Sequence, residues 1–252
     1  MTRPTLIVLG LLAGASPAAG QAPIQFFPRF DFHIGAEHLS QSDPRFVWDT
    51  NFGGVIDVVD YGIGRAALAA NYEAVLGQEF RNFDPNQGNY SLDASTSVRT
   101  HGSEFAAVMH HTSRHLSDRF KRAPVDWNML GLAVEHDVRA GASTLRPYGH
   151  VLGVLVQSNV DYRWEAIGGL DVRVPVRAHV SVIAGGNVRH LGVDGSRNRG
   201  AQTGGRVEAG MRFEGERGAI EFVVAGERRI DPYPLDLSSL SWLSAGFRFV
   251  SR

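Results

Sequence analysis

The chain has 252 residues, of which 43% are hydrophobic, and a formal net charge of -1 at pH 7. This charge balance gives no electrostatic reason to expect nucleic acid as a partner. Cysteine is absent, which excludes a lipoprotein anchored through an N-terminal cysteine.

The first twenty residues have the pattern of a secretory signal peptide. Arg3 supplies a positive charge, residues 6–15 form a short apolar run, and residues 18–20 are small enough for a cleavage site. The run is too short for a spanning helix. We therefore expect a signal peptide at 1–20 and a mature domain at 21–252.

The mature domain alternates between apolar and polar residues with a period of two. Near 206–214, for example, Val207 and Phe213 belong to the apolar series, and Arg206 and Arg212 belong to the polar one. This period indicates strands with one apolar and one polar face. No apolar run of 18 residues follows residue 20, so the sequence offers no helical span.

Twelve such segments follow one another, each of a length that can span a membrane when tilted. They lie near 28–38, 46–60, 63–76, 89–99, 103–113, 126–138, 144–157, 162–174, 177–190, 203–214, 218–229 and 240–250. Connections after the even-numbered segments are short, and those after the odd-numbered ones are longer, except after the seventh. Outer-membrane barrels have this rhythm, with short periplasmic turns and long external loops.

The sequence therefore predicts an all-β protein, an antiparallel transmembrane β-barrel of about twelve strands, in the outer membrane. A soluble periplasmic β-protein is the other reading of the alternation. Charged residues on the polar faces would fill the lumen as paired groups or line a narrow pore, and the limited room in twelve strands favours a filled interior. Trp48, Tyr72 and Trp242, near strand ends, would suit aromatic girdles at the membrane interfaces.

The stretch 109–128 contains the candidate catalytic residues. The apolar row that includes Phe105 and Met109 continues to His111 and Ser113, and Asn128 begins the apolar row of the next segment. All three polar side chains are thus predicted to face lipid, where polar groups are costly and are functional candidates. A hydroxyl, an imidazole and a carboxamide can form a hydrolytic triad, with Ser113 as nucleophile, His111 as base and Asn128 as its orienter.

These residues resemble the outer-membrane phospholipase A family. The resemblance rests on His111-x-Ser113 on one strand and Trp127-Asn128 on the next, together with the strand count. It implies a twelve-stranded barrel with a lipid-facing Ser-His-Asn triad, calcium as a cofactor and an active homodimer. Lipid A deacylases carry a similar His-x-Ser, and the run from His111 to Asp118 is similar to a family of uncharacterised bacterial barrels.

This chain departs from the phospholipase pattern in two places. Arg114-His115 stands where the phospholipase usually has Asn-Gly, and fifteen residues separate Ser113 from Asn128, a longer gap than in the phospholipase. Both departures put the calcium site and the oxyanion hole in question.

Neighbouring groups suggest further sites. His110, His111 and His115 suggest a metal site, but His110 and His111 face opposite sides of one strand, so a site shared by them is disfavoured. His115 is expected instead to form a hydrogen bond with Asp118 in the loop. Arg114, Arg119, Lys121 and Arg122 predict a basic loop that would either hold lipopolysaccharide phosphates or lie in solvent.

The leading hypothesis is therefore a lipid acyl-ester hydrolase of the outer membrane whose partners are phospholipid or lipopolysaccharide. The alternative is a non-enzymatic barrel, either a narrow pore or a structural protein.

Overall fold

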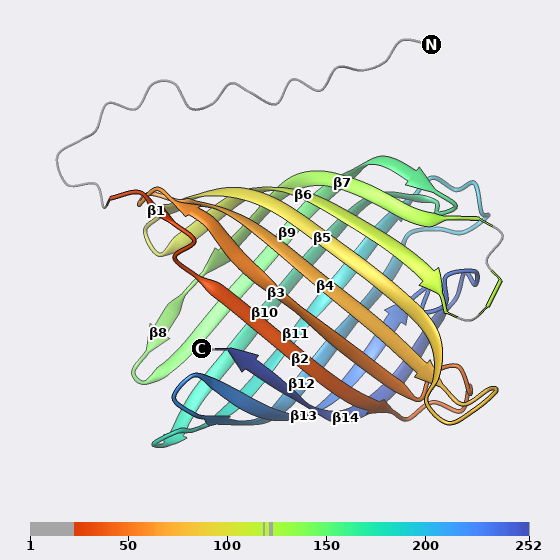
Figure 1. Ribbon diagram of the computed structural model, residues 1–252. Coiled ribbons are helices and arrows are strands. Elements are labelled where there is room, and N and C mark those ends of the chain that lie inside the picture. Colours follow the sequence, from red (N-terminus) through yellow and green to blue (C-terminus); the bar gives the residue numbers. More distant parts are fainter. Residues whose placement is uncertain (1–22, 118, 121–122, 252) are drawn as a thin grey trace, which may run out of the picture.

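The computed structural model describes residues 23–117, 119–120 and 123–251, and the described chain forms a closed barrel of twelve antiparallel strands (Figure 1). In chain order these are β2 (Phe30–Leu39), β3 (Trp48–Asp60), β4 (Arg65–Gly77), β5 (Asp84–Thr100), β6 (Ser103–Leu116), β7 (Val125–His136), β9 (Ser143–Ser158), β10 (Tyr162–Arg177), β11 (Val180–Val193), β12 (Gln202–Glu214), β13 (Gly218–Ile230) and β14 (Ser239–Ser251). Pairing of β14 with β2 closes the barrel, so the wall has no free edge. The predicted signal peptide at 1–20 lies outside the described residues.

Two short strands extend the barrel at one end. β1 (Gln25–Phe26) pairs with the last residues of β3, and β8 (Val138–Ala140) pairs with the start of β9. Within the described ranges, no helix is long and apolar enough to cross a membrane.

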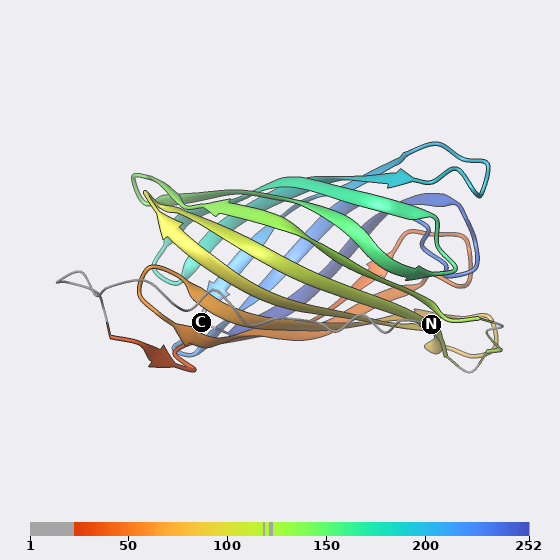
Figure 2. The ribbon, with the colours of Figure 1, turned by 90° about the horizontal axis from the view of Figure 1, so that it is seen from above.

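The two ends of the barrel differ in their connections. One end, here called the turn end, carries β1, the C-terminal residues of β14 and short hairpins (left in Figures 1 and 2). Between β5 and β6, for example, His101 and Gly102 both have positive φ (50° and 81°), as a two-residue type I′ turn requires. The other end, here called the loop end, carries most of the longer connections, and the short link 159–161 after β9 is the exception that the sequence predicted.

The side chains alternate across the wall as predicted. Outward-facing Leu68, Leu132 and Leu243 are 50%, 70% and 67% exposed. An apolar outer face with a polar interior is the pattern of a barrel in lipid. All twelve predicted segments are confirmed, although β5 begins earlier than expected, at Asp84, and β6 runs on to Leu116.

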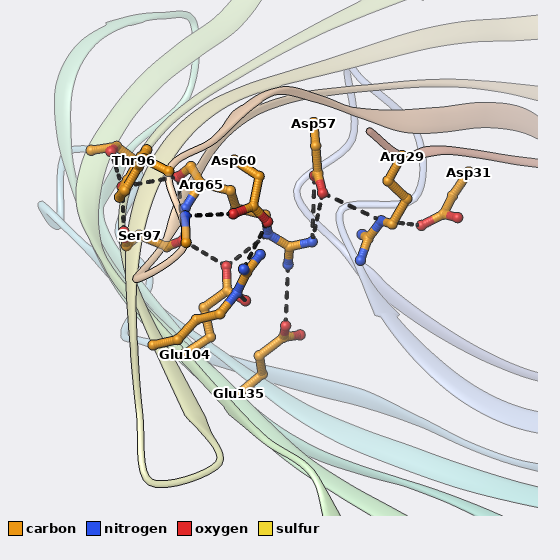
Figure 3. Close-up of polar contacts among 12 residues, drawn as sticks. Arg29, Asp31, Asp57, Asp60, Arg65, Thr96, Ser97, Glu104 and Glu135 are labelled. Carbon is orange, nitrogen blue, oxygen red and sulfur yellow. Dashed lines mark hydrogen bonds and ion pairs between the residues drawn. The ribbon is translucent and has the colours of Figure 1, made fainter. Parts of the chain in front are cut away.

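The lumen is filled with ion pairs in its turn-end half. Arg65 reaches Glu104 at 2.7 Å, and Asp57 and Glu135 at 3.3 Å each (Figure 3). Such pairing compensates the cost of placing charges inside a low-dielectric barrel. Two cavities remain among the charged groups of the lumen: one of about 660 Å³ beside Glu208 and Arg248, and one of about 520 Å³ beside Arg65 and Glu104.

The loop-end half of the lumen is closed by contacts that cross the barrel. Arg229 on β13 contacts Asp49 on β3 at 2.6 Å and Glu73 on β4 at 2.8 Å. Arg114 on β6 donates to the backbone oxygens of Asp231 and Pro232, which follow β13 on the opposite side. An apolar cluster packs beside these groups: Val125, Trp127, Met129, Leu152, Tyr162, Leu191 and Ile230. The interior is therefore packed at this end, as expected for a filled lumen.

Trp242 corrects one expectation. It points into the lumen, is 4% exposed, and stacks on Phe46 with ring centroids 5.8 Å apart. The prediction of a girdle residue was wrong here because Trp242 belongs to the inward series of β14, next to outward-facing Leu243. Trp48 is the first residue of β3. Because the next residue, Asp49, points into the lumen, Trp48 faces outward, as predicted.

Candidate functional site

His111, Ser113 and His115 lie in one outward row near the loop end of β6. Phe105 and Met109, 48% and 49% exposed, precede them in the same row. His110 points the opposite way and bonds through its two ring nitrogens to Asp93 and Thr112 in the lumen. The predicted opposite facing of His110 and His111 is therefore observed.

Asn128 lies directly across from His111 on β7. Its neighbours Trp127 and Met129 are buried in the lumen, which turns Asn128 outward. His111 Nδ1 lies 3.0 Å from Asn128 Oδ1. Because a carboxamide oxygen can only accept, Nδ1 is the donor, and Nε2 keeps the lone pair that a general base needs.

Ser113 lies two residues beyond His111 on β6, and its hydroxyl contacts an imidazole other than that of His111. Ser113 Oγ is 2.8 Å from His115 Nε2. Among the hydrogen bonds of the described residues, none joins Ser113 to His111, so their contact stays a prediction. The structure thus brings His111 and Asn128 together and places Ser113 beside them on the same face.

The cross-strand register continues from this site along the outer wall. One row of paired positions runs Phe32, Gly54, Ala70, Leu92, His111 and Asn128, from β2 to β7. Gly54 and Ala70, in the middle of the row, are the smallest residues in it. At Gly54 even a Cβ would clash with the carbonyl oxygen of Asp31. With glycine at this position, no side chain protrudes from this part of the outer face.

The small residues form the floor of an apolar groove of about 1100 Å³. On the loop side the groove is bordered by the rings of Phe52, Tyr72 and Tyr90, whose centroids are 5.3 Å and 5.0 Å apart. On the turn side it is bordered by Ile56, Leu68 and Met109, and His111 and Asn128 lie at its end. This groove is of a size that accommodates a small ligand.

The contact of His115 with Ser113 and the groove are the parts of the site that the sequence analysis did not predict. His115 shares the parity of His111 and Ser113, so the same rule would have included it. The groove depends on the alignment of Gly54 with Ala70 across two strands, for which no local pattern gives a signal.

The predicted basic loop is only partly observed. Arg114 is an inward residue of β6 that closes the lumen. Arg119 is held by Glu79 and Asp84 at 2.6 Å each. Burial lowers the pKa of Arg119, but its hydrogen bonds to Asp84 and Glu79 outweigh this effect and raise it overall. Neither guanidinium is presented to lipopolysaccharide, and Lys121 and Arg122 lie outside the described residues.

The groups around Ser113 give little support for calcium, which prefers six or more oxygen ligands. Asp126, opposite Ser113 in the register, accepts from the Ser158 hydroxyl at 3.4 Å. The described residues contain no group of three or more His, Asp and Glu side chains that could hold a metal ion. Asp118 lies outside the described residues.

Comparisons with known proteins identify similar folds. No family model and no curated protein matches the chain. The outer membrane phospholipase A of Escherichia coli is similar, with a TM-score of 0.55 and 10% identity over 90% of this chain and 98% of that one. The dimeric, calcium-bound outer membrane phospholipase of Salmonella typhi has a TM-score of 0.54 and 10% identity over 88% and 90% of the two chains. At this identity, the likeness shows a shared barrel fold.

Proposed function

We propose that this chain is a lipid acyl-ester hydrolase of the outer membrane, exported by its N-terminal signal segment. Ser113 is the nucleophile, His111 the general base, and Asn128 the residue that orients the imidazole. The substrate is a membrane lipid with an ester-linked acyl chain, either phospholipid or lipopolysaccharide.

The observation that carries the proposal is the His111–Asn128 hydrogen bond on the outward face of the wall. A polar pair in a row that otherwise faces lipid costs free energy, and such pairs are kept for function. The pair lies at the end of an apolar groove and beside a serine on the same strand. A lipid with its acyl chain in the groove would bring its ester to this end.

In the proposed reaction, Ser113 Oγ attacks the carbonyl carbon of the ester as the proton moves to His111 Nε2. The ester C–O bond then breaks, and His111 returns the proton to the leaving alcohol. Water, deprotonated by His111, then attacks the acyl-Ser113 ester. The bond from the acyl carbon to Oγ breaks, His111 returns the proton to Ser113 Oγ, and the fatty acid is released. Asn128 keeps Nδ1 protonated, so that Nε2 faces the reacting groups throughout.

The filled loop end of the lumen opposes the narrow-pore alternative. Arg114 on β6 reaches the opposite wall there, Arg229 joins β13 to β3 and β4, and the apolar cluster packs beside them. A structural barrel without activity is the remaining alternative.

The test is fatty-acid release by the purified, refolded full-length chain from phospholipid and from lipid A. Ser113→Ala is compared with Ser241→Ala, which alters an exposed serine on β14. We expect Ser113→Ala to abolish release and Ser241→Ala to leave it unchanged. Equal release from wild type and Ser113→Ala would refute the proposal.

Running each assay with calcium and with EDTA decides the cofactor that the resemblance implies. The homodimer stays a prediction, checked by sedimentation of the detergent-solubilised chain.

A further inference from the structure

His115 is a second imidazole in contact with the proposed nucleophile. It is exposed at the loop end of β6, and its Nε2 lies 2.8 Å from Ser113 Oγ. His111 lies on the other side of Ser113 in the same row and is engaged by Asn128. Ser113 thus stands between two imidazoles, and its hydroxyl bonds to the one that Asn128 does not hold.

The neighbours of His115 explain why its ring leans toward Ser113. The residue paired with His115 on the neighbouring strand β5 is Gly88, which has no side chain to pack against the ring. The Tyr72 hydroxyl occupies that space, since a Cβ on Gly88 would lie 2.5 Å from it. The His115 ring instead meets Tyr90 edge-on, with centroids 5.3 Å apart and planes at 77°. Tyr90 is itself the cross-strand partner of Ser113, so this contact directs the imidazole toward the hydroxyl.

This arrangement affects proton transfer. When His115 Nε2 accepts, the Ser113 hydroxyl donates its only proton toward the loop end. That proton is then not directed at His111 Nε2, and a serine attacks efficiently only when its base can take the proton. In this tautomer the hydroxyl must leave His115 before His111 can deprotonate it.

We infer that His115 is a positioning residue that holds the Ser113 hydroxyl away from His111 and thereby slows the proposed hydrolysis. The inference rests on the proposed function and adds a resting state to that site. Hydrolysis begins when the hydroxyl rotates from His115 to His111. The substrate's headgroup, which would lie at the exposed loop end beside His115, is placed to favour this change.

Three variants of the full-length chain test the inference. His115→Phe keeps an aromatic edge against Tyr90 but cannot accept a hydrogen bond. His115→Gln restores an acceptor at the same place. His190→Phe is the matched control, because His190 is another imidazole on the outer wall with a hydroxyl partner, Thr203 Oγ1 at 2.9 Å, and an aromatic neighbour, Trp164 at 5.3 Å.

Two experiments are made on each variant. The first measures kcat and KM for fatty-acid release from phospholipid, and the second measures the rate at which a small fluorophosphonate without a long chain labels Ser113. A neutral hydrogen bond contributes about 1 kcal/mol net, so its loss predicts a rise of about fivefold in both kcat and labelling rate for His115→Phe. KM should not change. His115→Gln should return both rates toward wild type, and His190→Phe should leave them unchanged.

The outcomes separate this inference from the proposed function. Labelling of wild type at Ser113 that is unchanged or slower in His115→Phe would overturn the inference and leave the hydrolase proposal standing. Labelling of His115→Phe but not of wild type would support both. If neither wild type nor His115→Phe is labelled at Ser113, both proposals fail.

Discussion

Replacing Asn128 with alanine tests the central geometric feature of the site. The change removes the acceptor for His111 Nδ1, a single neutral hydrogen bond of 3.0 Å. Such a bond contributes about 1 kcal/mol net, and about 1.4 kcal/mol corresponds to a tenfold change in rate. Because the imidazole itself remains, we expect kcat for fatty-acid release to fall by about five- to tenfold.

The expected order of effects is a stricter test than any single value. His111→Phe removes the base, whose contribution is typically about 10²- to 10⁴-fold, so it should be far more damaging than Asn128→Ala. Thr203→Ala, which removes the hydroxyl partner of outward-facing His190, is the matched control and should leave kcat unchanged. Since Asn128 faces outward, heat-modifiable migration should be the same for Asn128→Ala and wild type. An Asn128→Ala enzyme as fast as wild type would refute the role of the pair.

Three further predictions address the groove, the loops and the lumen. Ala70→Phe should fill the groove and lower kcat/KM on long-chain esters by about tenfold or more, since each buried methylene contributes about 0.8 kcal/mol; a short-chain ester should be hydrolysed as before. Arg199→Met should lower the free energy of unfolding in urea by about 3 kcal/mol, because it leaves buried Asp161 and Asp231 without their guanidinium. The wild-type chain should give no ion conductance in planar bilayers, whereas deletion of 232–237 should open the loop end and produce it.

The controls for these predictions come from similar positions elsewhere. Ala209→Phe places the same ring on the outward face of β12, away from the groove, and should not change chain-length preference. Arg197→Met removes an exposed guanidinium that donates to the Asn159 carbonyl and should change stability by less than about 1 kcal/mol. Equal effects of each variant and its control would contradict the corresponding role, and conductance by wild type would contradict a closed lumen.

The fold could be predicted from the sequence because its signal is local. Successive side chains of a strand face lipid and lumen in turn. Each strand therefore shows a two-residue period in its own sequence, as β12 does from Arg206 to Phe213. The same parity predicted that His111 and Asn128 face outward, and their pairing followed from adjacency of the two strands.

What could not be predicted depends on distant partners and on rotamers. Parity places Ser113 on the right face but does not choose between the imidazoles two residues before and after it, and the structure shows His115. The groove requires Gly54 and Ala70 to align across the sheet. The inward role of Arg114 depends on the loop after β13, far away in the chain.

The most direct test of the account is to trap the covalent intermediate. Full-length chain is mixed with excess phospholipid, quenched with acid during the first turnovers, and digested for peptide mass spectrometry. The account predicts an added acyl mass on Ser113, which disappears in Ser113→Ala and His111→Phe. Steady release of fatty acid with Ser113 unmodified, or with the acyl group on another residue, would contradict it.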